Sequence, residues 1–213
     1  MKLNATHINL SGGTLISPTH VLTAAHNVQD RNTLIDFKAS QIKVYIGEHR
    51  KGDSKFNVLT VAEVIKHPKY NTKKGSKYDN DIAILRLSEA VNFNSEVSPA
   101  CLPADAKSTY EGQRVTLSGW GLLGDSGGFP IPLQEVDVTV TTKAKCKKVW
   151  GRRKITSNMI CAGGSGKGAC TGDSGGPLIA RENGRHTLVI TLDKVLHSRG
   201  KMLQSQLFPL LFC

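Results

Sequence analysis

Short apolar runs separated by turn residues extend along most of this chain. The first half contains such runs at residues 14–16, 21–23, 41–47, 57–65 and 82–87. The second half adds runs at 115–120, 133–141, 159–161, 178–180 and 187–190. Ser17-Pro18-Thr19 lies between the first two runs and is typical of a hairpin turn. Many short strands with frequent turns predict an all-β protein, either a sandwich or a pair of barrels.

Composition agrees with this pattern. The chain has 213 residues, of which 39% are hydrophobic, 21% are charged and 21 are glycines. This length suits one large all-β domain or two small barrels, with enough apolar residues for a real core. Residues 99–103 contain two prolines and read as a connector between two halves. The apolar runs are too short to span a membrane, and no signal peptide is visible at the N-terminus.

The net charge of +11 makes acidic partners conceivable. Its densest basic stretch consists of Lys143, Lys145, Lys147, Lys148, Arg152, Arg153 and Lys154. We interpret this stretch as a solvated loop in preference to a polyanion site. No interleaved aromatic motif accompanies it, so no nucleic-acid partner is expected.

The turn at 172–177 carries the strongest candidate for chemistry. Its sequence is Gly-Asp-Ser-Gly-Gly-Pro, in which glycines on both sides let Ser174 sit exposed on a tight turn. A serine nucleophile needs a base and an acid that orients the base. His26 and Asp81 could supply them, although each alone reads as an ordinary turn residue. The order His, Asp, Ser excludes the α/β-hydrolase elbow, which requires Ser, acid, His.

The sequence around these residues resembles the chymotrypsin-fold serine endopeptidases, the S1 family. The matching segments are 12–17 with 22–26, then 78–85, 118–121, 159–163 and 170–177, in the order of the family. The resemblance implies two packed six-stranded antiparallel Greek-key barrels within one domain spanning 1–213. We expect the N-terminal barrel in 1–100, an incomplete C-terminal barrel in 101–189 and an atypical tail in 190–213. By this resemblance, we expect the first strand region and the last strands and helix of the family to be missing or replaced.

By this resemblance, His26 is the general base, Asp81 its orienting partner and Ser174 the nucleophile. The backbone N–H groups of Gly172 and Ser174 would form the oxyanion hole. Asp79 is a competing acid that we assign to the loop before the strand. The resemblance implies no metal and no cofactor.

The resemblance also locates the base of the primary substrate pocket at Gly168, with Ala169 beside it. Because neither residue carries a carboxylate, a neutral pocket for apolar side chains is expected in place of a lysine/arginine preference.

The resemblance extends to part of the cysteine framework. It implies a disulfide between Cys146 and Cys161, and makes Cys101 the tether for a propeptide or light chain. Ser11 and Asn27 stand where the family has the two cysteines that bracket the catalytic histidine. The count of five cysteines is odd, and the pairing of Cys101, Cys170 and Cys213 stays open.

Both ends of the chain depart from the family. In the family, a newly cleaved N-terminus inserts beside an aspartate that corresponds to Asp173, and no matching N-terminal segment is found. After residue 189, an unrelated tail replaces a strand that forms a pocket wall, and its apolar residues could patch the open barrel or aggregate.

The functional expectation is a secreted endopeptidase that hydrolyses peptide bonds of polypeptide substrates and is open to protease inhibitors. A truncated form without turnover, or a non-catalytic protease-like binding module, is the alternative.

Overall fold

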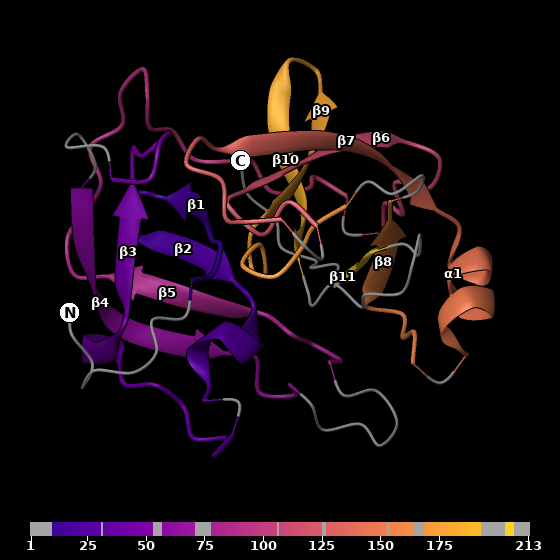
Figure 1. Ribbon diagram of the computed structural model, residues 1–213, viewed down its shortest axis with the longest axis horizontal. Coiled ribbons are helices and arrows are strands. Elements are labelled where there is room, and N and C mark those ends of the chain that lie inside the picture. Colours follow the sequence, from indigo (N-terminus) through magenta and orange to yellow (C-terminus); the bar gives the residue numbers. More distant parts are fainter. Residues whose placement is uncertain are drawn as a thin grey trace.

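The structure is a computed structural model built from two curled antiparallel sheets (Figure 1). It describes residues 10–30, 32–52, 57–70, 78–105, 107–124, 127–152, 154–163, 168–192 and 203–206. In that part of the chain, no helix is long and apolar enough to cross a membrane.

The first sheet has five strands in the order β1-β2-β5-β4-β3. They are β1 (Thr14–Ser17), β2 (His20–Thr23), β3 (Lys43–Ile46), β4 (Asn57–Lys66) and β5 (Ala83–Leu87). The predicted hairpin joins β1 and β2, and its turn is fixed by a 2.9 Å hydrogen bond between Ser17 Oγ and His20 Nδ1. Two short 3-10 helices, Ala25–Val28 and Ala39–Gln41, lie between β2 and β3.

The second sheet is a closed barrel in the order β10-β11-β8-β7-β6-β9. Its strands are β6 (Arg114–Gly119), β7 (Gln134–Thr141), β8 (Met159–Ala162), β9 (Pro177–Glu182), β10 (Arg185–Leu192) and β11 (Leu203–Gln206). The segment β11 pairs with β8 on one side and with β10 on the other. Closure of this barrel therefore uses backbone from the tail beyond residue 189.

The trypsin-like all-β architecture is confirmed, with a difference in strand count. The second unit has the expected six strands, whereas the described residues of the first unit form a five-stranded sheet. Tail residues 207–213, whose apolar side chains could patch the barrel or aggregate, lie outside the described residues, as do residues 1–9.

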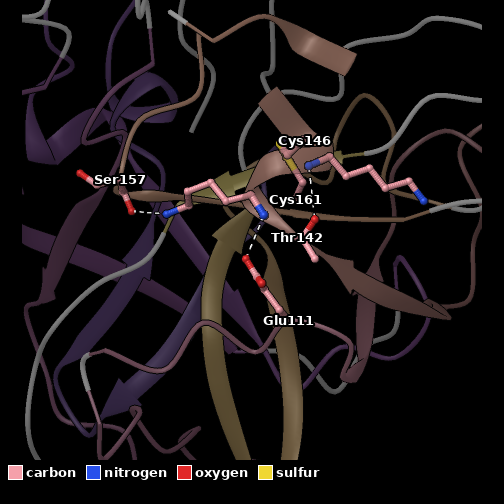
Figure 2. The surroundings of a disulfide bond; sticks show 7 residues. Glu111, Thr142, Cys146, Ser157 and Cys161 are labelled. Atoms are coloured by element: carbon pink, nitrogen blue, oxygen red, sulfur yellow. Dashed lines mark hydrogen bonds between the residues drawn. A yellow bond between two sulfur atoms is a disulfide. The ribbon is translucent and has the colours of Figure 1, made fainter. Parts of the chain in front are cut away.

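The first part of the basic stretch is a helix, whereas we expected the whole stretch to be a loop. Helix α1 (Lys143–Trp150) begins after Thr142, whose side chain accepts a hydrogen bond from Lys145 N, and ends at Gly151 with φ of 97°. Both are ordinary helix-capping residues. The helix buries Cys146, which forms the expected disulfide with Cys161 of β8 (Figure 2).

The described residues form four buried apolar clusters, one of which surrounds the Cys146–Cys161 disulfide with Ile155 and Met159. A second fills the first sheet around Val21 and Leu85, and a third fills the barrel around Val115 and Leu178. The fourth joins the two units through Leu22, Ile82 and Leu188. Since Leu22 and Ile82 lie four and one residues from His26 and Asp81, this interface brings the candidate site residues of the first sheet close to the second unit.

Candidate active site

The ends of two paired strands bring His26 and Asp81 together. In the β2–β5 pair, Thr23 at the end of β2 is opposite Ala83 at the start of β5. The 3-10 helix that follows β2 carries His26, and the turn that precedes β5 carries Asp81. The antiparallel register therefore places residues separated by 55 positions side by side.

The two side chains form a buried pair with defined geometry. His26 Nδ1 lies 2.6 Å from Asp81 Oδ2, and His26 N donates to Asp81 Oδ1 at 2.8 Å. Relative exposures are 7% for His26 and 1% for Asp81. With the carboxylate as acceptor, Nδ1 donates this hydrogen bond, which leaves Nε2 as the ring nitrogen that can take up a proton. The imidazole is held in the tautomer that general-base catalysis requires.

Asp79, the competing acid, has different partners. It is completely buried, and its Oδ1 accepts from Thr156 Oγ1 at 2.7 Å and from Asn158 Nδ2 at 3.2 Å. These residues belong to the segment before β8. Asp79 thus ties the loop of the first unit to the second unit, and Asp81 is the carboxylate bonded to the histidine.

Two features shape the serine turn: glycines with positive φ, and backbone N–H groups of which only some donate hydrogen bonds. Gly172 and Gly175 have φ of 104° and 82°, values that L side chains rarely adopt. Asp173 N donates to Cys170 O and Gly176 N donates to Asp173 O. Within the described part of the chain, the N–H groups of Gly172 and Ser174 donate to no acceptor. These are the two groups that the resemblance assigns to an oxyanion hole.

Asp173 anchors the turn through backbone amides. Its Oδ1 accepts from Gly121 N at 2.7 Å, and its Oδ2 accepts from Cys170 N at 2.8 Å. Burial raises the pKa of Asp173 above its ordinary value of 3.8, while these two hydrogen bonds and the charge of Lys51 oppose the rise.

The Gly119-Trp120-Gly121 segment makes room for this carboxylate. A Cβ atom on Gly119 or on Gly121 would come within 3.0 Å of Asp173 carboxylate atoms, a distance that real Cβ atoms essentially never reach. The glycines of this motif are therefore required by the approach of Asp173, a contact that the sequence motif alone does not reveal.

Lys51 contacts the peptide unit between Trp120 and Gly121, whose N–H group donates to Asp173. Its Nζ donates to Trp120 O at 3.1 Å and lies 4.8 Å from the centre of the Phe129 ring. Trp120 C=O and Gly121 N–H belong to one peptide unit, so this unit accepts from Lys51 and donates to Asp173. Hydrogen bonds linked in this way polarise one another. Lys51 was missed by sequence reasoning because its loop carries no motif.

The carbonyl of Ser174 attaches the turn to the first unit. It accepts from Gly12 N and from Asn27 Nδ2, both at 2.8 Å. Asn27 directly follows His26, so the structure brings the backbone of Ser174, the candidate nucleophile, to the element that carries the histidine. Ser174 itself is 8% exposed.

The remaining predicted residues are placed as follows. Ala169 is buried in the barrel core and Gly168 is exposed, and their role in a substrate pocket stays a prediction. Cys101 lies in the connector, where its backbone pairs with His186 and Leu188 of β10, and its role as a tether stays a prediction. Cys213 lies outside the described residues.

The class of chymotrypsin-like serine proteases is defined by a two-unit all-β fold in which a His–Asp pair and a glycine-rich serine turn come from different units. Both features are present in this structure, where Asn27, next to His26, hydrogen-bonds to Ser174 O. The trypsin family model matches residues 1–194, and this chain belongs to that family. It is similar to a protein named venom serine protease from Polistes dominula, with 35% identity over 184 residues. That match covers 84% of this chain and 64% of the relative's length.

Proposed function

We propose that this chain is a serine endopeptidase that cleaves peptide bonds through an acyl-enzyme. The observation that carries the proposal is the buried His26–Asp81 pair beside the Ser174 turn, where the N–H groups of Gly172 and Ser174 donate to no acceptor among the residues that the structure describes. Family membership supports the same reaction.

The first step forms the acyl-enzyme. His26 Nε2 takes the hydroxyl proton of Ser174 while Oγ attacks the carbonyl carbon of the scissile bond. The oxygen of the tetrahedral intermediate accepts hydrogen bonds from the N–H groups of Gly172 and Ser174, each worth roughly 2.7–4 kcal/mol. Asp81 stabilises the imidazolium through Nδ1. His26 then gives its proton to the leaving amine, and the C–N bond breaks.

The second step releases the acid product. A water molecule gives a proton to His26 and attacks the acyl carbon, and the returning proton restores the hydroxyl of Ser174. The reaction therefore consumes one water and leaves both side chains as they began.

For specificity, we propose that the substrate is a polypeptide with an apolar side chain at the primary pocket. Gly168 and Ala169 support this preference because neither offers a carboxylate to a cationic side chain. We also propose that the protein works outside the cell, since a disulfide such as Cys146–Cys161 persists in oxidising compartments.

A fluorophosphonate probe tests the activity directly. The natural chain should be labelled at Ser174, as located by peptide mass spectrometry, and Ser174→Ala should abolish labelling. Ser157→Ala, at an exposed serine on a loop, serves as the control and should label like the natural chain. A folded natural chain that takes up no probe and hydrolyses no peptide would overturn the proposal and favour a protease-like binding module.

A further inference from the structure

Asn27 belongs to a small hydrogen-bond network between the two units. Its Nδ2 donates to Ser174 O at 2.8 Å and to Thr23 Oγ1 at 3.2 Å. Thr23 Oγ1 donates to Gly12 O at 2.8 Å, and Gly12 N donates to Ser174 O at 2.8 Å. Three residues of the first unit thereby close a ring on the carbonyl of the candidate nucleophile.

The partners fix the orientation of the Asn27 amide. Ser174 O can only accept, and the Thr23 hydroxyl hydrogen is already directed at Gly12 O, so Thr23 accepts from Asn27. Both amide hydrogens are therefore used. Within the described part of the chain, Asn27 Oδ1 is buried and has no hydrogen-bond partner. Because buried polar atoms are normally hydrogen-bonded, an amide whose oxygen is buried without a partner contributes less to stability than a fully bonded one.

The network packs directly against the serine turn. A Cβ atom on Gly175 would come within 3.0 Å of Thr23 Oγ1, Asn27 Nδ2 and Gly12 O. No side chain fits between the turn and the network. The position of Ser174 is therefore coupled to the Asn27 side chain without an intervening layer.

We propose that Asn27 is a positioning residue that holds the Ser174 backbone at the correct place relative to His26. It occupies one of the two positions where the family that this chain resembles has cysteines bracketing the histidine. In this chain, an amide hydrogen bond to the nucleophile's carbonyl takes over the task of restraining the His26 segment. The inference rests on the proposed peptidase function, in which a 1 Å misplacement of a reacting group can cost about 100-fold in rate.

Two substitutions at Asn27 separate the donated hydrogen bond from simple packing. Asn27→Ala removes both donated hydrogen bonds. Asn27→Asp keeps the shape but places a carboxylate oxygen against Ser174 O, so two acceptors face each other. Gln29→Ala is the matched control, because Gln29 is a nearby amide whose Nε2 donates to Leu34 O at 2.8 Å, away from the turn.

Kinetics of the full chain give the main measurement. We expect Asn27→Ala to lower kcat and the rate of fluorophosphonate labelling by about 10- to 100-fold with little change in KM. Asn27→Asp should lower them at least as much, and Gln29→Ala should stay within about twofold of the natural chain. Labelling of Asn27→Asp at the natural rate, or an equal loss in Gln29→Ala, would overturn the inference. If Asn27→Asp does not fold, Asn27→Ala carries the test.

Hydrogen exchange distinguishes this inference from the proposed function. The amide of Gly12 donates to Ser174 O, so its exchange reports on the network without any turnover. Asn27→Ala should accelerate exchange in the peptides that contain Gly12 and Gly176, and Gln29→Ala should not. Unchanged exchange in Asn27→Ala would overturn the inference even if the natural chain is active. If Asn27→Ala exchanges faster but the natural chain binds no probe, the restraint by Asn27 is supported and the proposed peptidase function is rejected.

Discussion

The two halves of the candidate site are held by different kinds of contact. In the first unit, His26 and Asp81 meet as side chains, at the ends of paired strands whose register fixes their distance. In the second unit, the Ser174 turn is held through the backbone: Asp173 accepts from two main-chain amides and Ser174 O accepts from Gly12 N. The first half therefore depends on a contact between two side chains, whereas the second depends on contacts to backbone groups of a turn that leaves no room for an added Cβ atom.

The largest effect should come from the side-chain half. Asp81→Asn should lower kcat by about 10⁴-fold, because an amide donor facing Nδ1 favours the tautomer with the hydrogen on Nε2, which cannot take the serine proton. Peptide hydrolysis at fixed pH measures the loss. Asp79→Asn, the same change at the neighbouring buried acid, should alter kcat by less than about tenfold, because Asp79 hydrogen-bonds to Thr156 and Asn158 whereas Asp81 is the carboxylate bonded to His26 Nδ1. Equal losses in the two variants would refute the assignment of Asp81.

Adding a side chain next to the Ser174 turn should destabilise the second half of the site. Gly119→Ala should lower the free energy of unfolding by roughly 2–4 kcal/mol, since the new Cβ displaces the Asp173 carboxylate from its amide donors. Urea denaturation measures this loss, and labelling of Ser174 should fall with it. Gly128→Ala is the control, because a Cβ there meets nothing within 4 Å, and it should change stability by less than about 0.5 kcal/mol. A Gly119→Ala variant as stable as the control would show that the carboxylate has room to move.

This contrast also explains what the sequence alone could predict. The residues of the side-chain half stand in recognisable motifs, and the Cys146–Cys161 disulfide follows from the same resemblance. The capping residues Thr142 and Gly151 were readable signals for α1, but the density of lysines favoured a loop interpretation. The contacts of Lys51 and Asn27 could not be predicted, because they depend on how two distant segments meet in the folded chain. The pairing of β11 with β8 and β10 could not be predicted either, because it depends on contacts between segments far apart in the sequence.

The protonation of Asp173 offers a smaller and pH-dependent test of the backbone half. Burial raises its pKa in the folded state above the ordinary value of 3.8, so folding takes up a proton between 3.8 and the raised pKa. The stability contributed by this group is complete below 3.8 and is lost as the pH rises through the raised pKa. Denaturation from about pH 3.5 to about pH 7 should show this fall in the natural chain relative to Asp173→Asn, in which the group cannot titrate. Parallel curves would indicate that the carboxylate is not desolvated.

The smallest effect should come from Lys51, which acts on Asp173 through the Trp120–Gly121 peptide. Lys51→Met removes a hydrogen bond to Trp120 O and a cation near Phe129, and should lower the free energy of unfolding by about 1 kcal/mol. Because the charge of Lys51 lowers the pKa of Asp173, its removal should also move the pH window of that carboxylate upward.

Lys66→Met is the control for Lys51→Met, since Lys66 also lies over an aromatic ring, that of Tyr70, and pairs with Asp36, but its charge is not among the causes that shift the pKa of Asp173. Lys66→Met can lower stability by a comparable amount. It should not shift the pH range over which Asp173 loses its contribution to stability. If Lys51→Met leaves that pH range unchanged, the charge of Lys51 does not act on Asp173, and the Asp173 carboxylate is governed by its burial and by its amide donors, Gly121 N and Cys170 N.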